Sequence, residues 1–238
     1  MQHNNLYTFK FIAMITIVAS LLLTLAATQL KERQDFNIEV DKKKNILKSI
    51  GLDVAAMQAN TIIEEYKNKI QDVVLKQNGD RVNHISSEDL ESVENKSTGQ
   101  LSYFYENHEY LPAYLASEPQ AFIFPVSGKG LWSTLYGYLA LDMDLNTVKG
   151  ITFYKHGETP GLGGEIEKKW FQDNFIGKKI FDNSGNLKSI TVVKGKAVDD
   201  KHEVDGISGA TITSRGVTDF LKRDLQRYFT FLTIHRSN

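Results

Sequence analysis

Residues 205–217, with the sequence DGISGATITSRGV, place hydroxyl groups among glycines where a helix or strand core would need bulk. Six of the seven residues from 208 to 214 are Ser, Gly, Ala or Thr. Gly206 and Gly209 allow backbone conformations denied to other residues and let a ligand approach the main chain closely. Such a segment suits the binding of a small polar group by backbone N–H groups and hydroxyls.

The same segment leads into an expected helix, with Thr213 or Ser214 as the predicted N-cap. Free N–H groups and the positive end of the helix dipole would then lie beside Thr211. A helix start of this kind favours a phosphate. The spacing alone also fits an ordinary loop followed by a helix cap.

A second segment, KHGETPGLGGE at residues 155–165, predicts an exposed turn between a strand and a helix, because glycines flank Pro160. Glu158 and Thr159 begin the turn as an acceptor and a hydroxyl. They could bond the polar edge of a flat heterocycle while Leu162 packs on its face. Taken alone, the segment equally fits a turn in which Glu158 is solvated.

Motifs for nucleotide binding, metal binding and nucleophilic catalysis are incomplete or absent in this sequence. Residues 161–166, GLGGEI, resemble a dinucleotide loop but have Ile166 where the third glycine belongs. Cysteine is absent and the six histidines are scattered, so we expect no metal site. No serine lies in a nucleophile elbow, and no catalytic residue is predicted. Any redox chemistry must therefore use a bound cofactor.

The composition excludes some classes of protein and favours others. The 238 residues carry 28 basic and 29 acidic groups, which argues against a nucleic-acid partner. Residues 11–30 carry no charge and are long enough to cross a bilayer, so a retained membrane anchor is predicted rather than a cleaved signal peptide. Thr and Ser recur at every fourth position from 16 to 28. They would contact a partner helix or bond their own helix carbonyls.

The remaining elements predict an α+β fold. We expect a short helix at 40–52, a second helix at 57–79 and a polar loop at 80–100. Strands are expected at 120–126, 135–144, 147–156 and 187–195, and helices at 163–178 and 213–232. The predicted organisation is a tail at 1–10, a transmembrane helix at 11–30, a helical connecting region at 31–100 and a ligand-binding domain at 101–238.

The two motifs together resemble the FMN-binding domain shared by two related proteins: the C subunit of the sodium-translocating NADH:quinone oxidoreductase and the G subunit of the Rnf electron-transport complex. The family pattern Asp-Gly-x-Ser/Thr-Gly-Ala-Thr is matched at residues 205–211, and ETPGLG at 158–163 is the second signature. SGKGLWSTLYGY at 127–138 and DKKKNIL at 41–47 are similar to the sodium-pump branch. The resemblance covers nearly the whole chain.

The resemblance implies a set of site residues. It names Thr211 as the residue that carries FMN through a phosphoester, and it implies FMN contacts from the other positions of the two motifs: Ser208, Gly209, Ala210, Glu158, Thr159, Leu162 and Gly163. Lys194, in TVVKGK, would either place positive charge near the flavin ring or remain a solvated strand-end lysine.

The resemblance also implies a function. The chain would relay single electrons within a membrane complex that couples NADH oxidation and ubiquinone reduction to sodium export. It would need the other subunits and a flavin transferase, and would sit in a bacterial inner membrane with a periplasmic domain. The basic residues after the anchor favour a cytoplasmic domain instead; we follow the resemblance. The alternatives are an Rnf-type G subunit and an anchored sensor that binds a phosphate ligand reversibly.

Overall fold

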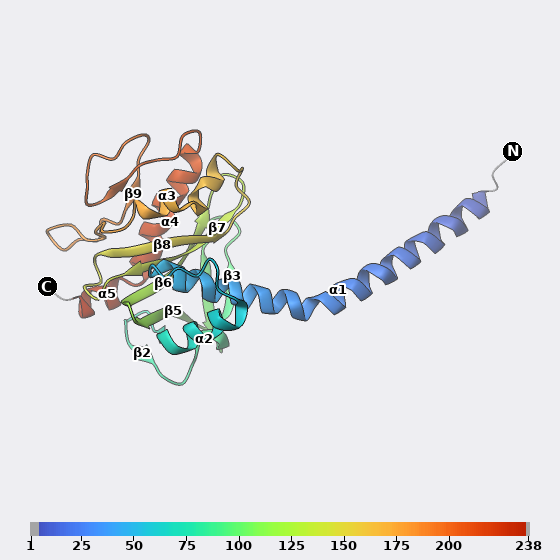
Figure 1. Ribbon diagram of the computed structural model, residues 1–238, viewed down its shortest axis with the longest axis horizontal. Helices are drawn as coiled ribbons and strands as arrows, with labels where there is room; N and C mark the ends of the chain where they lie inside the picture. The colour runs from blue at the N-terminus through green and yellow to red at the C-terminus, as the bar shows by residue number, and fades with distance from the viewer. Residues whose placement is uncertain (1–4, 237–238) are drawn as a thin grey trace. The chain divides into compact units, whose positions relative to one another are not determined.

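The first helix is longer than the sequence pattern predicted. The structure is a computed structural model that describes residues 5–236, and the chain divides into two units, Met1–Asp41 and Lys42–Asn238. Helix α1 (Asn5–Ser49) is continuous, so the expected separate helix at 40–52 is wrong (Figure 1). It is long and apolar enough to cross a membrane. Thr16, Thr24 and Thr28 each donate a hydrogen bond to the carbonyl oxygen four residues earlier. These hydroxyls therefore bond their own helix, the second of the two possibilities given above.

The second unit is built on one antiparallel sheet. Within the described residues, eight strands form it, in the order β2-β1-β5-β6-β7-β8, with β4 pairing with both β5 and β3. The strands are β1 (Ile70–Leu75), β2 (Arg81–Val82), β3 (Glu91–Glu94), β4 (Leu101–Tyr105), β5 (His108–Ser117), β6 (Gln120–Lys129), β7 (Thr134–Leu141) and β8 (Val148–Lys155). A separate parallel pair joins β9 (Thr191–Val192) to β10 (Glu203–Val204).

One predicted helix is partly a strand. Helix α2 (Ala59–Lys69) ends where β1 begins, so Ile70, Val73 and Val74 lie in the sheet and not on a helix face. β1 pairs along its whole length with β5, and the pairing places these residues in the core. Tertiary pairing has overridden a local pattern that also fits a 3.6-residue period. Residues 31–100 therefore contribute strands as well as helices.

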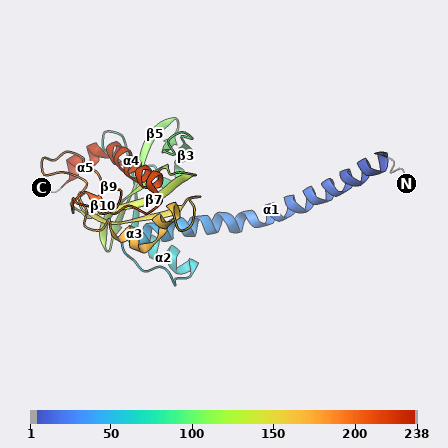
Figure 2. The same cartoon turned by 90° about the horizontal axis from the view of Figure 1, so that it is seen from above.

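Helices cover both faces of the sheet. Helix α4 (Thr211–Arg227) and helix α5 (Phe229–His235) lie on one side and α2 on the other (Figure 2). Phe124 of β6 contacts Tyr228 with ring centroids 4.7 Å apart, and Phe153 of β8 meets Phe220 of α4. Between β8 and α4 lie the 3₁₀ turn η2 (Gly163–Glu167) and helix α3 (Lys169–Asp173); η1 (Ser87–Asp89) precedes β3. The α+β prediction is confirmed, because antiparallel strands dominate the sheet and no regular βαβ repeat occurs in the part described.

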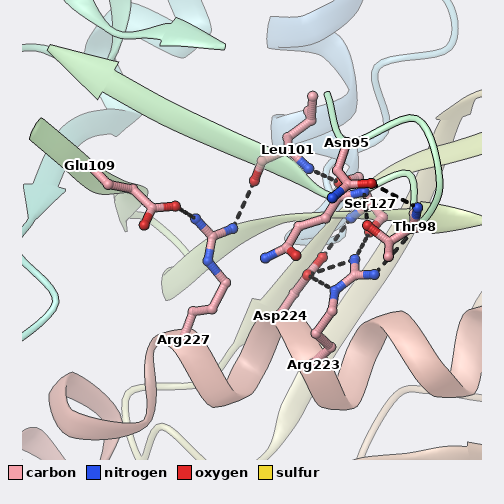
Figure 3. Close-up of polar contacts among 9 residues, drawn as sticks. Asn95, Thr98, Leu101, Glu109, Ser127, Arg223, Asp224 and Arg227 are labelled. Atoms are coloured by element: carbon pink, nitrogen blue, oxygen red, sulfur yellow. Dashed lines mark hydrogen bonds and ion pairs between the residues drawn. The ribbon is translucent and has the colours of Figure 1, made fainter. Parts of the chain in front are cut away.

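Helix α4 is fixed to the sheet by a charged network (Figure 3). Asp224, which is buried, accepts a hydrogen bond from the backbone N–H of Ser127 at 2.8 Å. Arg223 bonds the other carboxylate oxygen and donates to the carbonyl oxygens of Ser127 and Thr98. Arg227 donates to the carbonyl oxygen of Leu101. The network ties α4 to β6 and to the segment around β4, which sets the position of the helix start.

We expect Asp224→Ala to lower the free energy of unfolding by about 2–3 kcal/mol, because a buried N–H and a partly buried guanidinium lose their acceptor. Burial raises the pKa of Asp224 above its usual value, although Arg223 opposes that effect. Asp224→Asn keeps an acceptor for Ser127 and should lose roughly half as much. Urea unfolding of the full chain in neutral detergent measures both. Equal losses would show that the hydrogen bond to Ser127 contributes nothing.

Candidate functional site

The two sequence motifs meet in the folded chain. The Thr213 hydroxyl, in the first turn of α4, donates to Oε2 of Glu158 at 2.7 Å. Leu162 lies against Gly209: a Cβ on that glycine, whose φ is +75°, would come within 2.7 Å of a Leu162 methyl. Segments some fifty residues apart in sequence thus form one site.

Glu158 organises a third segment. Its carboxylate accepts hydrogen bonds from the backbone N–H groups of Leu131 (3.2 Å), Trp132 (2.9 Å) and Ser133 (3.1 Å), in the turn between β6 and β7. Its side chain is 5 % exposed. These bonds use both carboxylate oxygens, so Glu158 fixes the 131–133 turn rather than standing solvated or offering a free acceptor at the surface.

The hydrogen bonds also set the charge state of Glu158. Burial alone would raise its pKa, because a carboxylate loses hydration in the interior. The hydrogen bonds from Thr213 and from the three backbone N–H groups outweigh burial and lower the pKa below its ordinary value. Glu158 is therefore an anion at neutral pH, held by donors from two elements.

Thr211 is the first residue of α4 and is exposed. Ala210 occupies the N-cap position and has no side-chain cap, so the prediction of Thr213 or Ser214 as N-cap is wrong. The Thr213 hydroxyl bonds Glu158, and among the residues described the N–H groups of the first turn have no acceptor. Gly209 supplies the positive φ just before the helix, while Ser208 is exposed and Ala210 is buried. Thr211 thus presents a hydroxyl at the positive end of a 17-residue helix.

A pocket of about 250 Å³ lies beside Thr211. Lys194, Thr211 and Arg215 all line it. Ser214 also lines it, and its buried Oγ has no hydrogen-bond partner among the residues described. A buried orphan hydroxyl, two cations and a free helix start fit a phosphate group chemically.

Exposed apolar side chains surround the motifs. Trp132 is 71 % exposed and Leu162 is 43 % exposed, and both belong to the segments that Glu158 and Gly209 bring together. Leu131 and Ile212 are also exposed. Thr159 lies in the exposed turn, and its carbonyl accepts from the N–H groups of Leu162 and Gly164. This rim can cover a flat apolar ring next to the polar pocket.

Comparison with known proteins identifies the family. A model of the FMN-binding domain matches residues 130–226, which include the 131–133 turn, both motifs and the pocket beside Thr211. The C subunit of the Na(+)-translocating NADH-quinone reductase from Haemophilus ducreyi is 37 % identical over 229 residues, covering 90 % of this chain and 87 % of its own. The chain belongs to the family of C subunits of the Na(+)-translocating NADH-quinone reductase. The resemblance inferred from the motifs is confirmed.

Further members of this C-subunit family agree with the assignment. The C subunit from Pseudomonas aeruginosa is 34 % identical and covers 92 % of this chain and 91 % of its own. The crystal structure of the C subunit from Parabacteroides distasonis superposes with a TM-score of 0.72 at 37 % identity, over 86 % of this chain and 97 % of the other. The fold of the C-subunit family is therefore the fold described here.

Sequence reasoning missed several residues of the site. Ser214 and Arg215 line the pocket, and Thr213 links the two motifs. Arg215 follows Thr211 by four residues. Because α4 begins at Thr211, this spacing places both residues on one face of the helix. The segment around Trp132 indicated the sodium-pump branch but not a place in the site, because Glu158 positions its turn from a distant segment.

We expect Gly163→Ala to destabilise the site. A Cβ at Gly163 would lie 2.6 Å from the Thr213 hydroxyl and 2.7 Å from Oε2 of Glu158, so it would break their contact. The melting temperature should fall by roughly 6 °C, equivalent to about 2 kcal/mol. Gly157→Ala is the control: like Gly163 it has no positive φ, and its Cβ would come no closer than 3.3 Å to another residue. Equal shifts in the two variants would contradict a specific clash at Gly163.

Proposed function

We propose that this chain is the membrane-anchored flavin subunit of an Na⁺-translocating NADH:ubiquinone reductase, with FMN joined to Thr211 by a phosphoester. The observation that carries the proposal is the pocket beside Thr211, which Lys194 and Arg215 also line, at the start of helix α4. FMN supplies one-electron chemistry between donors and acceptors in such a complex. The chain's residues provide attachment, position and charge.

The polar side of the site holds the phosphate. Among the residues described, the N–H groups of the first turn of α4 have no other acceptor, and a phosphoester on Thr211 would lie at the positive end of the helix. Lys194 and Arg215 balance its charge from the pocket wall. The small residues at 208–210 leave a flavin transferase free access to the Thr211 oxygen.

The apolar side of the site receives the ring. Leu162 and Trp132 are exposed at the rim, and the bonds of Glu158 fix the turn that carries Trp132. We assign the ring to this rim because aromatic and aliphatic surfaces bind flat heterocycles without a precise hydrogen-bond match. Lys194, from the segment after β9, lines the phosphate pocket and not this rim, so we assign its charge to the phosphate. Glu158 acts on the ring through the turn that it positions.

Membrane placement is part of the proposal. The apolar part of α1 anchors the chain in a bacterial inner membrane, and the FMN-binding domain lies in the periplasm beside the other subunits. A covalent bond suits a carrier outside the cytoplasm, where free FMN would be lost. Alkaline phosphatase fused after residue 238 should be active, whereas β-galactosidase at the same place should be inactive. The reverse result would place the domain in the cytoplasm.

The attachment is tested by mass analysis of the protein made alongside a flavin transferase. Trypsin should release residues 202–215 as one peptide, since Lys201 and Arg215 bound it and no basic residue cleavable by trypsin lies between. We expect its mass to increase by that of FMN less one water, with the modification at Thr211. An unmodified peptide under these conditions would refute covalent attachment.

Two alternatives are separated by simple observations. Membership of the C-subunit family favours the sodium pump over an Rnf-type complex and its G subunit, and co-purification with one complex or the other decides between them. A sensor that binds a phosphate ligand reversibly would release the ligand on denaturation. Flavin fluorescence that survives a denaturing gel excludes such a sensor.

A further inference from the structure

A second cavity, of about 650 Å³, lies in the Lys42–Asn238 unit at the end of α1. Its wall combines the last turns of α1, the turn that follows them, β8 and α3. Four lysines line it: Lys44, Lys48, Lys149 and Lys169. None of these lysines belongs to the site around Thr211, and the proposed electron transfer gives the cavity no role.

Among the residues described, two of the four lysines in this cavity form ion pairs and two do not. Lys149 pairs with Asp142 at 2.7 Å, and Lys169 pairs with Asp173 at 2.9 Å. Within residues 5–236, no carboxylate forms an ion pair with Lys44 or Lys48. Asp53 also lines the cavity, but its Oδ1 accepts from the N–H of Ala55 in its own turn.

Lys44 and Lys48 stand one helical turn apart, where like charges repel. Among the charges that act on Lys48, the favourable one of Glu167 is the largest, followed by repulsion from Lys169 and Lys44, and Asp173 also acts favourably. A fold that brings these ammonium groups to one recess gains stability when an anion enters. Lys44 and Lys48 are therefore the lining lysines that remain for an anion, because Lys149 and Lys169 already have carboxylate partners.

The apolar part of the wall narrows the choice of ligand. Leu52, Val54, Ile151 and Ile176 line the cavity with the lysines, and Ile176 is 56 % exposed. The volume lies within the range of roughly 300–1,000 Å³ typical of small-molecule sites. A ligand with a phosphate at one end and an apolar or uncharged part at the other would use both surfaces.

We propose that this cavity binds a phosphate-bearing anion, held chiefly by Lys44 and Lys48. Two sources supply that chemistry: a free phosphate compound and the headgroup of an anionic phospholipid. The second source is included because the chain carries a helix long and apolar enough to cross a membrane. The site is separate from flavin attachment and does not depend on it.

The test uses the full chain and two probes. In neutral detergent, pyrophosphate is titrated by calorimetry into the Lys44→Gln/Lys48→Gln variant and the unmodified chain. In nanodiscs, native mass spectrometry counts phosphatidylglycerol retained from mixtures with phosphatidylcholine. Lys67→Gln/Lys222→Gln is the charge-matched control, since both of its lysines are exposed elsewhere on the domain. The double variant Lys44→Gln/Lys48→Gln should fold, because it removes a repulsion.

We expect a loss of affinity of about tenfold or more in Lys44→Gln/Lys48→Gln and little change in the control. Specific loss of pyrophosphate binding supports a free phosphate ligand, and specific loss of retained phosphatidylglycerol supports a lipid headgroup. Binding of neither probe, or equal losses in the two double variants, overturns the proposal. Repeating the test in Thr211→Val separates it from flavin attachment, because binding in the cavity should be unchanged.

Discussion

Thr211→Val, made alongside a flavin transferase, will carry no flavin that survives denaturation. Valine keeps the branched shape of threonine at the first position of α4 but has no oxygen to esterify. The expected result is complete loss of flavin fluorescence from the band on a denaturing gel, since no other residue is predicted to form the ester. The folded chain should keep its melting temperature within about 1 °C, because the side chain is exposed.

Two controls make the Thr211 result specific. Thr211→Ser retains the hydroxyl and should restore labelling at a reduced rate. Thr191→Val removes another exposed hydroxyl that lines the same pocket and should be labelled as well as the unmodified chain. Persistent fluorescence in Thr211→Val, or its loss in Thr191→Val, would place the attachment elsewhere.

Glu158→Ala will be among the most destabilising single substitutions in this domain. It removes the acceptor of three backbone N–H groups and of the Thr213 hydroxyl, in a position that is 5 % exposed. Leaving part-buried donors unpaired costs at most about 1–3 kcal/mol each, and these losses overlap, so we expect about 3 kcal/mol. Urea unfolding measures the loss. Labelling of Thr211 should also slow, because the contact with Thr213 holds the start of α4.

The comparison variants for Glu158 separate charge from packing. Glu64→Ala removes an exposed carboxylate on α2 and should change stability by less than about 0.5 kcal/mol. Glu158→Gln keeps the volume but turns an N–H₂ group toward N–H donors, so it should recover little of the stability. A Glu158→Gln variant as stable as the unmodified chain would show that the carboxylate charge is unimportant.

The stability of the unmodified chain should fall in acid partly through Glu158. The folded-state pKa is lowered relative to an ordinary value of 4.5, so the folded state binds this proton less readily than the unfolded state. The stabilisation is fully present above about pH 4.5 and is lost as pH falls through the lower folded-state pKa. Unfolding of Glu158→Ala should depend less on pH in that window. Parallel pH profiles for the two proteins would contradict this linkage.

The amino-acid sequence by itself determined the features that depend on local chemistry. An uncharged run of bilayer length, a glycine-rich segment ending in Thr211 and the turn around Pro160 are all readable without a fold. The strands β6, β7 and β8 also follow from their β-branched and apolar residues. These signals lie within short stretches of chain, so they led directly to the family and to the candidate attachment residue.

The tertiary structure decided the features that depend on distant contacts. Residues 70–75 satisfy a helical pattern, but pairing with β5 buries them as a strand. Glu158 looked like a free acceptor until the fold surrounded it with the 131–133 turn and Thr213. Helix α4 begins at Thr211, two or three residues before the predicted start. This places Ser214 and Arg215 on the helix and in the lining of the pocket. A side chain's role in this protein is set by which unpaired groups the sheet and helices bring within hydrogen-bond distance, and no local pattern contains that information.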